Sequence, residues 1–480
     1  MKTKKTSRRD FLKQLAFAGA SVVAAPTILG ALSDSSEEHR TGGAGRPRVP
    51  GAKSVENLVT VPREKVRVAL VGLGQRGLGF LSCGSKRPDY AGLLGEILNV
   101  PFAQVTALCD TDSSRAEYAC EICLKKRPDD PRPSVYAGTD NAWEHLCENE
   151  NADVVVIATP WHLHVPVAIA AMNSGKHAFI EVPAALTVDD CWSLVDTSEQ
   201  TQRHCVLLEN CCFGDEEMFV LNMVKHGVFG KITHAECAYL HDLRAMLFRQ
   251  GTEGDWRRKY HQRYNGNLYP THGLGPVCKY LDINCTDRLK SLVSMSSSEA
   301  GLSEFRVRGN AASENSGLEK YVCGDMNITL IKTDLGRTIL LKHDVVTPQP
   351  YSRINRIAGT EATFSGYPPR LTLDLPEKYD ISASADGHAW LGERDFSKML
   401  NMFREPFWRE RRDRIRHFAH GGMDYAMCFR LLDSIRQGTT PEITVYDAAV
   451  WSCIVELSAV SVAKGSVPVE IPDFTRANLS

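Results

Sequence analysis

The sequence has almost no excess of charge of either sign. Its 480 residues carry 56 basic and 58 acidic side chains, which leave a formal net charge of −2. Proteins that bind nucleic acid or an anionic membrane through their overall charge are strongly basic. We therefore expect neither of these as a partner.

A framework of paired cysteines is also absent. The fifteen cysteines are an odd number, spread from Cys83 to Cys453. Several lie in apolar runs, where a thiol behaves as a small buried hydrophobe: Cys109, Cys205 and Cys237. Cys120 and Cys123 form a Cys-x-x-Cys pair, which metal and redox sites also use, but no second pair stands at zinc-ribbon spacing. We expect buried thiols and no metal site at this pair.

The N-terminus lacks an apolar run long enough to span a membrane. Residues 7–13 (SRRDFLK) precede a short run of small and apolar residues from Gln14 to Ala25. This order predicts a twin-arginine signal peptide over residues 1–31, cleaved after Ala25 or Ala31, with a basic disordered tail as the alternative. We expect no membrane span in the mature form, the twin-arginine translocase as a partner during export, and a periplasmic or cell-surface location.

Residues 32–61 are rich in Ser, Gly, Glu and Pro. Such composition is typical of a solvated chain without a core. We therefore predict a linker between the leader and the folded part.

Short apolar strands alternate with helix-length segments from Val66 onward. The strands are expected at residues 66–71, 105–109, 153–158, 177–180 and 205–208. Strands that are apolar on both faces predict a parallel sheet covered by helices on both sides. The fold class is therefore α/β, beginning with a doubly wound Rossmann domain over residues 62–185.

The character of the strands changes from Ile232 onward. Longer segments of alternating polarity run over residues 232–240, 326–331 and 338–342. Alternation predicts a sheet with one wet face, so residues 186–480 are expected to form an α+β domain with an open, largely antiparallel sheet. The boundary between the domains is expected between residues 185 and 210.

A glycine-rich motif follows the first strand directly. Residues 72–77 read GLGQRG, and in such loops glycine allows a tight turn, close approach of a pyrophosphate and close helix packing. Gly72, Gly74, Gln75 and Gly77 are therefore expected to bind a dinucleotide.

Asp110 ends the second strand, where a carboxylate can accept hydrogen bonds from the adenosine ribose. This position favours NAD over NADP. Asp110 lies 33 residues after Gly77 (110 − 77 = 33), so residues of about 82–102 are expected to be an insertion. Alternatively, Asp110 caps a helix with Thr111 and Ser113.

The strand at 153–158 is followed by residues 159–164 (TPWHLH), and the next strand ends at Glu181-Val182-Pro183. The carboxyl ends of parallel strands are where open α/β sheets bind ligands, so residues 159–164 are expected to line the nicotinamide half of the crevice. His162 and His164 could instead be metal ligands.

Together these residues resemble the glucose-fructose oxidoreductase and inositol dehydrogenase superfamily, which has Glu-Lys-Pro at the place of residues 181–183. Val182 replaces the lysine that the dehydrogenases use, which argues against simple sugar dehydrogenation. The chain is more similar to glycoside hydrolase family 109, the NAD-dependent α-N-acetylgalactosaminidases. The likeness spans residues 62–430, and its shared segments are residues 159–164, 181–185, 208–210, 238–244, 265–276 and 350–353.

The resemblance implies two sets of contacts. For the cofactor they are Arg76, Gly77, Asp110, Trp161, His162, Leu163, His164, Glu181, Val182, Asn210 and Tyr269. For the sugar they are Tyr239, Arg257, Tyr269, Pro270, Thr271, His272 and Tyr351. Either tyrosine could instead be a buried ring with a satisfied hydroxyl, and Arg257 a solvated charge.

The catalytic residues implied are Tyr239, Tyr269, His272 and His420. A phenol near an imidazole can transfer protons when its pKa is lowered, and His420 would protonate the leaving oxygen. His420 begins the segment His420-Gly-Gly, and Phe418 and Ala419 stand before it where the family has glycines.

The reaction implied by the resemblance is oxidation followed by elimination, instead of displacement by two carboxylates. NAD+ takes a hydride from C3 of the sugar, a base removes the acidified C2 proton, and the C1 substituent leaves. Water then adds at C1 and the hydride returns to C3, so NAD is regenerated each turnover and can stay tightly bound during export. The substrate is a small molecule or a glycan. An exported NAD(P)-dependent sugar oxidoreductase and a non-catalytic sugar-binding protein are the alternatives, and a homo-oligomer stays open.

Overall fold

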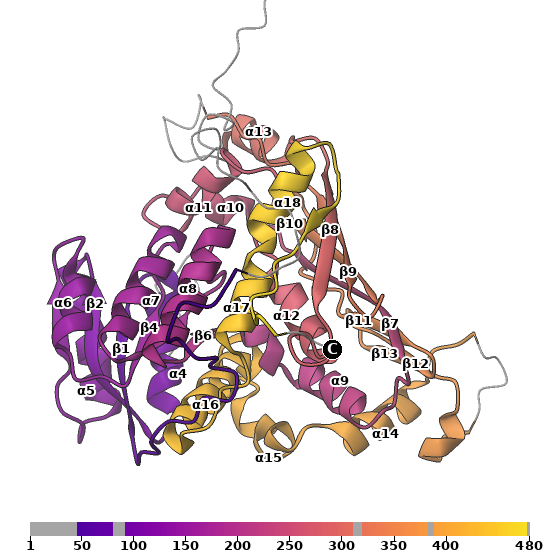
Figure 1. Ribbon diagram of the computed structural model, residues 1–480, viewed down its shortest axis with the longest axis horizontal. Helices are drawn as coiled ribbons and strands as arrows, with labels where there is room; N and C mark the ends of the chain where they lie inside the picture. The colour runs from indigo at the N-terminus through magenta and orange to yellow at the C-terminus, as the bar shows by residue number, and fades with distance from the viewer. Residues whose placement is uncertain (1–45, 80–91, 311–318, 383–387, 478–480) are drawn as a thin grey trace, which may run out of the picture. The chain divides into compact units, whose positions relative to one another are not determined.

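The first sheet consists of six parallel strands (Figure 1). Their order is β3-β2-β1-β4-β5-β6, with the topological switch point between β1 and β4, as in a Rossmann fold. The strands are β1 (Val66–Val71), β2 (Ala103–Asp110), β3 (Ser134–Ala137), β4 (Val154–Ile157), β5 (His177–Ile180) and β6 (Cys205–Leu207). The computed structural model describes residues 46–79, 92–310, 319–382 and 388–477, and the predicted signal peptide lies outside them.

The expected fold class is confirmed, and one strand of the first sheet differs from the prediction. Strand β3 was missed because it is only four residues long and has no fully buried position. Strand β6 pairs with β5, as the strand expected at residues 205–208 predicts, so the first sheet ends at Leu207, within the expected boundary region of residues 185 to 210. The helices of this half are α3 (Gln75–Leu78), α4 (Gly92–Asn99), α5 (Ser113–Lys126), α6 (Ala142–Asn149), η1 (Trp161–Leu163), α7 (His164–Asn173) and α8 (Val188–Thr201).

Helix α4 corrects the expectation of an insertion over residues 82–102. Leu93, Leu94 and Ile97 are almost fully buried, so α4 belongs to the core and, with α3, forms part of the connection from β1 to β2. The long spacing between Gly77 and Asp110 therefore includes a structural helix. Residues 82–91 lie outside the described residues.

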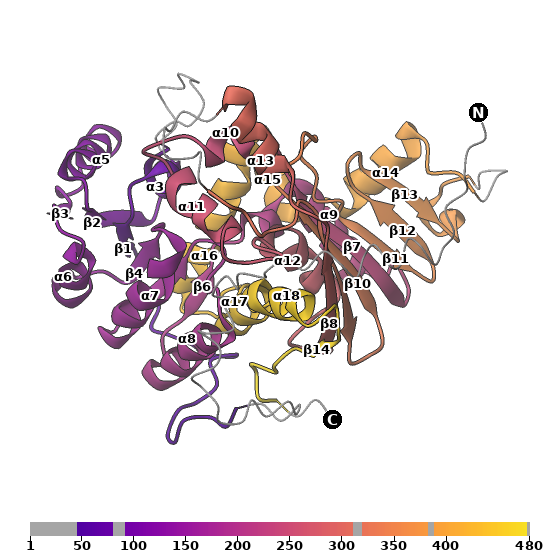
Figure 2. The same cartoon turned by 90° about the horizontal axis from the view of Figure 1, so that it is seen from above.

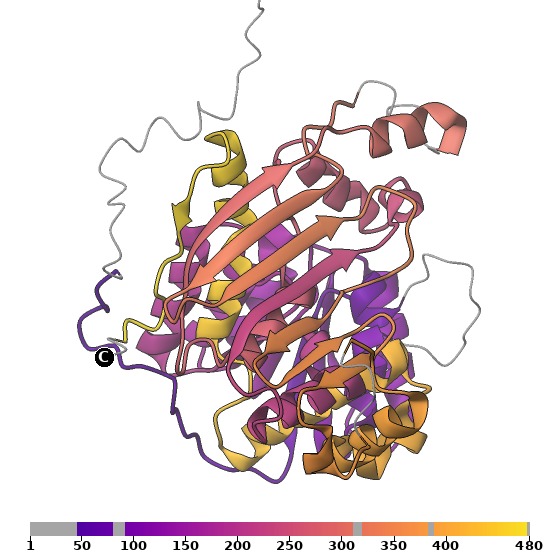
Figure 3. The same ribbon diagram turned by 90° about the vertical axis from the view of Figure 1, so that its right-hand side faces the viewer.

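The second sheet has eight strands in the order β13-β12-β11-β7-β10-β9-β8-β14. Strands β7 and β10 are parallel and every other pair is antiparallel. The strands are β7 (Ile232–Leu240), β8 (Leu289–Ser296), β9 (Asn327–Thr333), β10 (Thr338–Asp344), β11 (Arg356–Gly359), β12 (Ala362–Ser365), β13 (Arg370–Leu373) and β14 (Val469–Glu470). Burial alternates strictly along β9, and in Figure 3 no helix of the described residues covers the outer face of the sheet, as the sequence pattern predicts.

Helices cover the inner face of the second sheet, and several C-terminal helices return to the first (Figure 2). Helices α12 and α18 pack on β7 and β8, whereas α16 packs on α4 and α17 on α8. The elements of this half are η2 (Asn210–Phe213), α9 (Asp215–Lys225), α10 (Arg244–Leu247), α11 (Gly254–His261), α12 (Thr271–Tyr280), α13 (Gly301–Phe305), η3 (Arg306–Asn310), η5 (Pro376–Tyr379), α14 (Glu393–Phe403), α15 (Pro406–Ile415), η6 (Ala419–Gly422), α16 (Met423–Gln437), α17 (Val445–Ser452) and α18 (Ile454–Ala463). Helices from the C-terminal end of the chain therefore pack against helices of the first sheet.

Residues 46–61 are part of the fold, which corrects the prediction of a solvated linker for them. The Arg48 guanidinium makes two hydrogen bonds, of 2.9 and 3.0 Å, to the buried carboxylate of Glu199. The Val55 side chain is buried and its amide donates to the Tyr446 hydroxyl. The Gly- and Pro-rich composition of this segment did not reveal the buried side chain of Val55 or the ion pair that the partly exposed Arg48 makes with Glu199.

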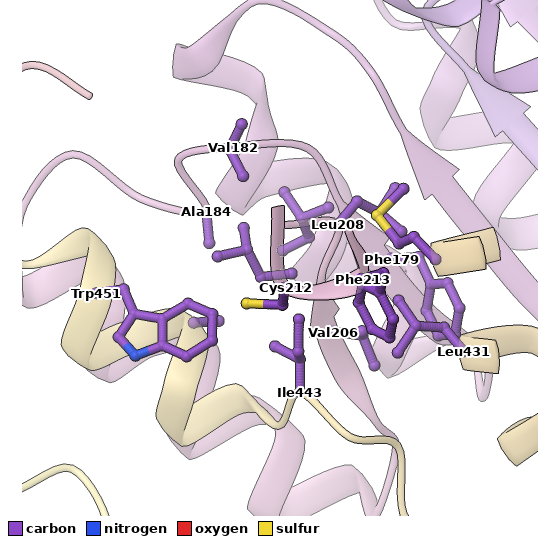
Figure 4. Close-up of a cluster of buried hydrophobic side chains, with 14 of the residues drawn as sticks. Phe179, Val182, Ala184, Val206, Leu208, Cys212, Phe213, Leu431, Ile443 and Trp451 are labelled. Carbon is purple, nitrogen blue, oxygen red and sulfur yellow. The ribbon is translucent and has the colours of Figure 1, made fainter. Parts of the chain in front are cut away.

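A continuous hydrophobic core joins the two sheets, and Figure 4 shows part of it at Val182, Cys212 and Trp451. Among the described cysteines all are free and all but Cys285 are buried, Cys120 and Cys123 included. The segment Val445–Ala463 is long and apolar enough to cross a membrane, but 78% of it is buried inside the protein. We therefore assign it to the core.

Candidate active site

The glycine loop leaves room for a ligand at one glycine and none at the other two. A Cβ on Gly72 would lie 2.5 Å from the Ala158 oxygen, and one on Gly77 would lie 1.9 Å from the Gly72 oxygen. A Cβ on Gly74 would meet nothing within 4 Å. Gly72 and Gly77 are therefore required by close packing, whereas the space over Gly74 fits a pyrophosphate.

Two buried polar atoms close to this loop have no hydrogen-bond partner among the residues that the structure describes. They are Gln75 Oε1, at the start of α3, and Thr159 Oγ1, just after β4. Unpaired buried polar atoms are rare and are commonly satisfied by a ligand. Together with the space over Gly74, they show that the residues present fit a dinucleotide.

Asp110 serves the glycine loop and does not cap the following helix. Its carboxylate accepts hydrogen bonds from the Leu73 amide at 2.7 Å and from the Asp112 amide at 2.9 Å. The N-cap of α5 is Asp112, which rules out the capping alternative for Asp110. From the end of β2, Asp110 thus holds the glycine loop that follows β1. A ribose would lie beside this carboxylate.

Arg76 joins the glycine loop to the C-terminal half. Its Nε donates to Glu181 at 2.6 Å, and its Nη1 and Nη2 donate to Asp424 at 2.7 and 3.1 Å. Asn210 also donates to Asp424, at 2.7 Å. Three residues implied for cofactor binding, Arg76, Glu181 and Asn210, therefore meet around one fully buried carboxylate.

The same carboxylate holds His420. His420 Nδ1 lies 2.8 Å from Asp424 Oδ2, and 53% of the His420 side chain is exposed. Burial acts to raise the pKa of Asp424, but the charges of Arg76 and His420 hold it well below its ordinary value. A permanent carboxylate therefore orients His420 from Nδ1 and leaves Nε2 for exchange of a proton, as in other carboxylate–histidine pairs.

His272 belongs to a second pair of this kind. Its Nδ1 lies 2.8 and 3.0 Å from the two carboxylate oxygens of Glu209, which is fully buried. Burial acts to raise the pKa of Glu209, but the charge and hydrogen bond of His272 keep it below its ordinary value. The ring is therefore fixed, with Nε2 available on its other side.

Aromatic rings stack between the two domains. Tyr239, at the end of β7, lies 4.7 Å from Tyr269 between ring centroids, and both lie within 5.2 Å of the His272 ring. The Arg257 guanidinium lies 4.6 Å from the Tyr269 ring and 5.2 Å from the Trp161 ring. A chain of contacts thus leads from the expected nicotinamide side at Trp161 to the expected sugar side at Tyr239, and Arg257 is buried instead of solvated.

The two tyrosines do not have the lowered pKa that we expected. Burial raises the pKa of Tyr239 to about 12, although Arg257 acts in the opposite direction. Burial also raises the pKa of Tyr269 well above its ordinary value. Loss of hydration outweighs the nearby positive charge, so both phenols are protonated at neutral pH.

His241 is a residue of the site that the sequence reasoning missed. Its Nδ1 lies 3.0 Å from the Tyr239 hydroxyl, and burial together with Arg257, His272 and His420 lowers the pKa of His241 to about 4. The neutral His241 ring accepts a hydrogen bond from the Tyr239 hydroxyl. The lone pairs of that hydroxyl oxygen then point away from His241. The influence of His272 and His420 on His241 also indicates that the two histidine–carboxylate pairs face one region.

Some predicted residues lie outside this group. His164 is buried, and its ring nitrogens lie 2.8 Å from the Pro183 oxygen and 2.9 Å from the Thr159 oxygen, which leaves neither free for a metal. His162 is exposed and lines a separate cavity of about 300 Å³ with Trp161 and Leu186. The remaining predicted residues differ in burial. Val182, in the cluster of Figure 4, Pro270 and Thr271 are buried, Leu163 is half-buried, and Tyr351 is 39% exposed.

One group among the described residues could hold a metal ion, namely Glu209, Cys211 and His272. Hydrogen bonds already link Glu209 to His272, and the Arg353 guanidinium lies 3.1 Å from Cys211 Sγ. A cation there would meet the positive charge of Arg353. The donor set therefore fits a hydrogen-bonded cluster better than a metal centre.

Comparison with known protein families matches both halves of the chain. Residues 66–208 match the oxidoreductase family with an NAD-binding Rossmann fold, and residues 213–480 match the glycosyl hydrolase 109 C-terminal domain. A glycosyl hydrolase family 109 protein of Solibacter usitatus is 42% identical, over 98% of each chain. This chain belongs to glycosyl hydrolase family 109.

Other relatives extend this assignment. A protein of Shewanella oneidensis named alpha-N-acetylgalactosaminidase is 38% identical, over 98% of this chain and 96% of that one. Among solved structures, an NAD-binding oxidoreductase from Klebsiella pneumoniae superposes with a TM-score of 0.62 at 14% identity, and a levoglucosan dehydrogenase in complex with NADH and L-sorbose with 0.60 at 17%. They cover 85% and 86% of this chain and 99% and 100% of their own. At such identities they show the fold. This family 109 chain is a glycosyl hydrolase with an NAD-binding Rossmann domain.

Proposed function

We propose that this family 109 enzyme removes terminal N-acetylgalactosamine from glycans by oxidation at C3 and elimination across C1 and C2. The Shewanella relative, whose name states this specificity, supports the choice of sugar. Bound NAD supplies the reversible oxidation at C3. The proton transfers at C2 and at the leaving oxygen fall to side chains of the protein.

The observation that carries the proposal is the state of the carboxylates in the site. Displacement by two carboxylates needs one of them to act as the acid. Glu209 and Asp424 are each bound to a histidine and have a lowered pKa, whereas burial raises the pKa of Glu181, whose carboxylate accepts a hydrogen bond from Arg76 Nε at 2.6 Å. Glu209 and Asp424 are thus held ionised, and Glu181 is engaged by the Arg76 guanidinium. In the described part of this site His272 and His420 are the groups placed to exchange protons, and this favours elimination.

The two histidines have separate tasks in this scheme. His272, oriented by Glu209, is the base that takes the C2 proton, because its Nε2 is free while Nδ1 is held. His420, oriented by Asp424, protonates the leaving oxygen and later takes a proton from the entering water. Tyr239 and Tyr269 hold the sugar as neutral hydroxyls, since their pKa values are raised.

Export and cofactor use support each other in this proposal. A cofactor that is oxidised and reduced within each turnover can be loaded in the cytoplasm, held tightly and carried out inside a folded protein. We therefore propose export by the twin-arginine translocase and a periplasmic or cell-surface location. The net charge of −2 gives no reason to expect nucleic acid as a partner.

The test is hydrolysis of p-nitrophenyl α-N-acetylgalactosaminide by the purified protein in buffered deuterium oxide. We expect release of nitrophenol and one deuterium at C2 of the released sugar, seen by NMR and mass spectrometry. The β-anomer and the N-acetylglucosaminide, run in parallel, define the specificity. Release of nitrophenol without deuterium would indicate direct displacement, and oxidation of free sugars without release would indicate an oxidoreductase.

A further inference from the structure

Glu96 lies behind the His420 loop, although it is far from that loop in the sequence. It is on α4, 4% exposed, and its Oε1 accepts a hydrogen bond from the Ala419 amide at 3.3 Å. Helix α4 packs against α16, which carries Asp424 in its first turn. The carboxyl of Glu96 thus contacts the backbone immediately before His420.

The backbone that Glu96 contacts has an unusual course. His420, Gly421 and Gly422 have φ values of +50°, +68° and +92°, in the left-handed region, and His420 is not a glycine. A residue with a side chain is strained in the left-handed region unless its surroundings hold it there. The Ala419 amide is the contact on the N-terminal side of this turn, and the Asp424 carboxylate is the contact on its C-terminal side.

The charges around Glu96 make its burial costly. Burial and the negative charge of Asp424 raise the pKa of Glu96 to about 7, while the Ala419 amide acts against the rise. The other titratable groups that face it are Tyr425 and Cys428 of α16 and Lys126 of α5. Burial of a carboxyl group at this position is unfavourable for the stability of the fold. The hydrogen bond from the Ala419 amide is the contact that we expect to account for its presence.

We propose that Glu96 is a positioning residue for His420, which fixes the turn at Ala419 so that the imidazole reaches the leaving oxygen. This inference rests on the proposed role of His420 as the acid. In this chain Phe418 and Ala419 stand before the histidine, and Phe418 packs its ring 5.5 Å from that of Tyr425. Both residues that precede His420 are therefore held in place: Phe418 packs against Tyr425, and the Ala419 amide donates to Glu96.

The test compares Glu96→Ala and Glu96→Gln on two substrates of different leaving-group ability. p-Nitrophenolate leaves with little help, whereas the alkoxide of methyl α-N-acetylgalactosaminide needs a proton, and general acids contribute about 10²-fold or more. We expect Glu96→Ala to lose at least about tenfold in kcat on the methyl glycoside and less than about threefold on the p-nitrophenyl glycoside. Glu96→Gln should keep most of both rates, because its amide oxygen can still accept from Ala419. Glu117→Ala, an exposed carboxylate on the neighbouring α5, is the control.

Equal losses on both substrates would overturn the proposal, as would unchanged rates in Glu96→Ala or a Gln variant as poor as the Ala variant on the methyl glycoside. Thermal unfolding of each variant in the NAD-loaded form shows whether it folds. Incorporation of deuterium at C2 by the unmodified enzyme in the same assay reports the proposed function separately. Failure of the function and failure of the Glu96 assignment are therefore distinguished.

Discussion

His204, just before β6, is a buried histidine that should make the fold sensitive to acid. Its ring stacks on His177 at 5.1 Å between centroids, and its Nε2 is buried without a partner in the described part of the chain. Burial, and then the charge of Arg203, lowers the pKa of His204 to about 4. In the unfolded chain His204 is therefore protonated below about pH 6.5. In the folded chain it is protonated only below about pH 4.

The sign follows from this difference. The stability contributed by neutral His204 is present above pH 6.5 and is lost as the pH falls toward 4. At pH 5 the loss is about 2 kcal/mol for this residue. We expect His204→Phe, which keeps the stack but does not titrate, to lose about 2 kcal/mol less than the unmodified protein between pH 7.5 and pH 5, measured by urea unfolding. His226→Gln, at an exposed position, should change nothing, and an equal acid loss in His204→Phe would refute the assignment.

Site residues were predictable one at a time but not as pairs. Tyr239, Tyr269, His272 and His420 stand in segments that resemble a known family, and the structure brings them to one region. The spacing does not show that Glu209 meets His272, because Glu209 precedes η2, His272 lies in α12, and the two come into contact only after folding. The raised pKa of the tyrosines was likewise hidden, since burial at an interface is a property of the fold.

Among the elements, the glycine loop offers a matched pair of variants. Gly77→Ala places a Cβ 1.9 Å from the Gly72 oxygen, so the loop must move, and we expect a loss of about 3 kcal/mol or more in the free energy of unfolding. Gly74→Ala meets no atom within 4 Å, and Gly74 has a φ of −80°, which alanine tolerates. We therefore expect Gly74→Ala to fold normally but to retain at most about a tenth of the NAD after dialysis, because the methyl group occupies the space assigned to the pyrophosphate.

The measurements are thermal unfolding and the ratio of NAD to protein after dialysis. The control is Gly392→Ala, because a Cβ at Gly392 would also meet no atom within 4 Å. Gly336→Ala is unsuitable, since Gly336 has a φ of +83°. Full retention of NAD by Gly74→Ala would contradict the placement of the pyrophosphate over this residue.

Strands with strong hydrophobic patterns were predictable, and elements that depend on distant partners were not. The limits of β1, β5 and β7 agree with the expected ranges; β1 and β5 are apolar and buried almost throughout. Strand β3 has no fully buried residue, and α4 was hidden by the unusual spacing after the glycine loop. The segment at residues 46–61 owes its order to Arg48, Val55 and their distant partners Glu199 and Tyr446, which composition cannot reveal.

At the scale of the whole molecule, the two sheets depend on one another for the site. Arg76 and Glu181 come from the Rossmann half, while Asp424 and His420 come from the C-terminal helices that return to it. His420, for which we propose a role as the acid, is thus linked through the Asp424 carboxylate to Arg76 of the glycine loop. Folding around NAD should accordingly favour the arrangement in which both histidine–carboxylate pairs are complete.

This dependence gives a prediction about export. If the cofactor is enclosed during folding in the cytoplasm, the exported enzyme should carry about one NAD per chain. We expect the same chain behind a leader of the general secretory pathway, which exports unfolded protein, to reach the periplasm without NAD and to be inactive until NAD is added. Arg8→Lys with Arg9→Lys in the original leader should leave a loaded, active enzyme in the cytoplasm, which controls for folding. The measurement is NAD content by mass spectrometry together with hydrolysis of the p-nitrophenyl glycoside in each fraction. Equal NAD content behind both leaders would mean that the cofactor is acquired outside, and the link between folded export and a regenerated cofactor would then be lost.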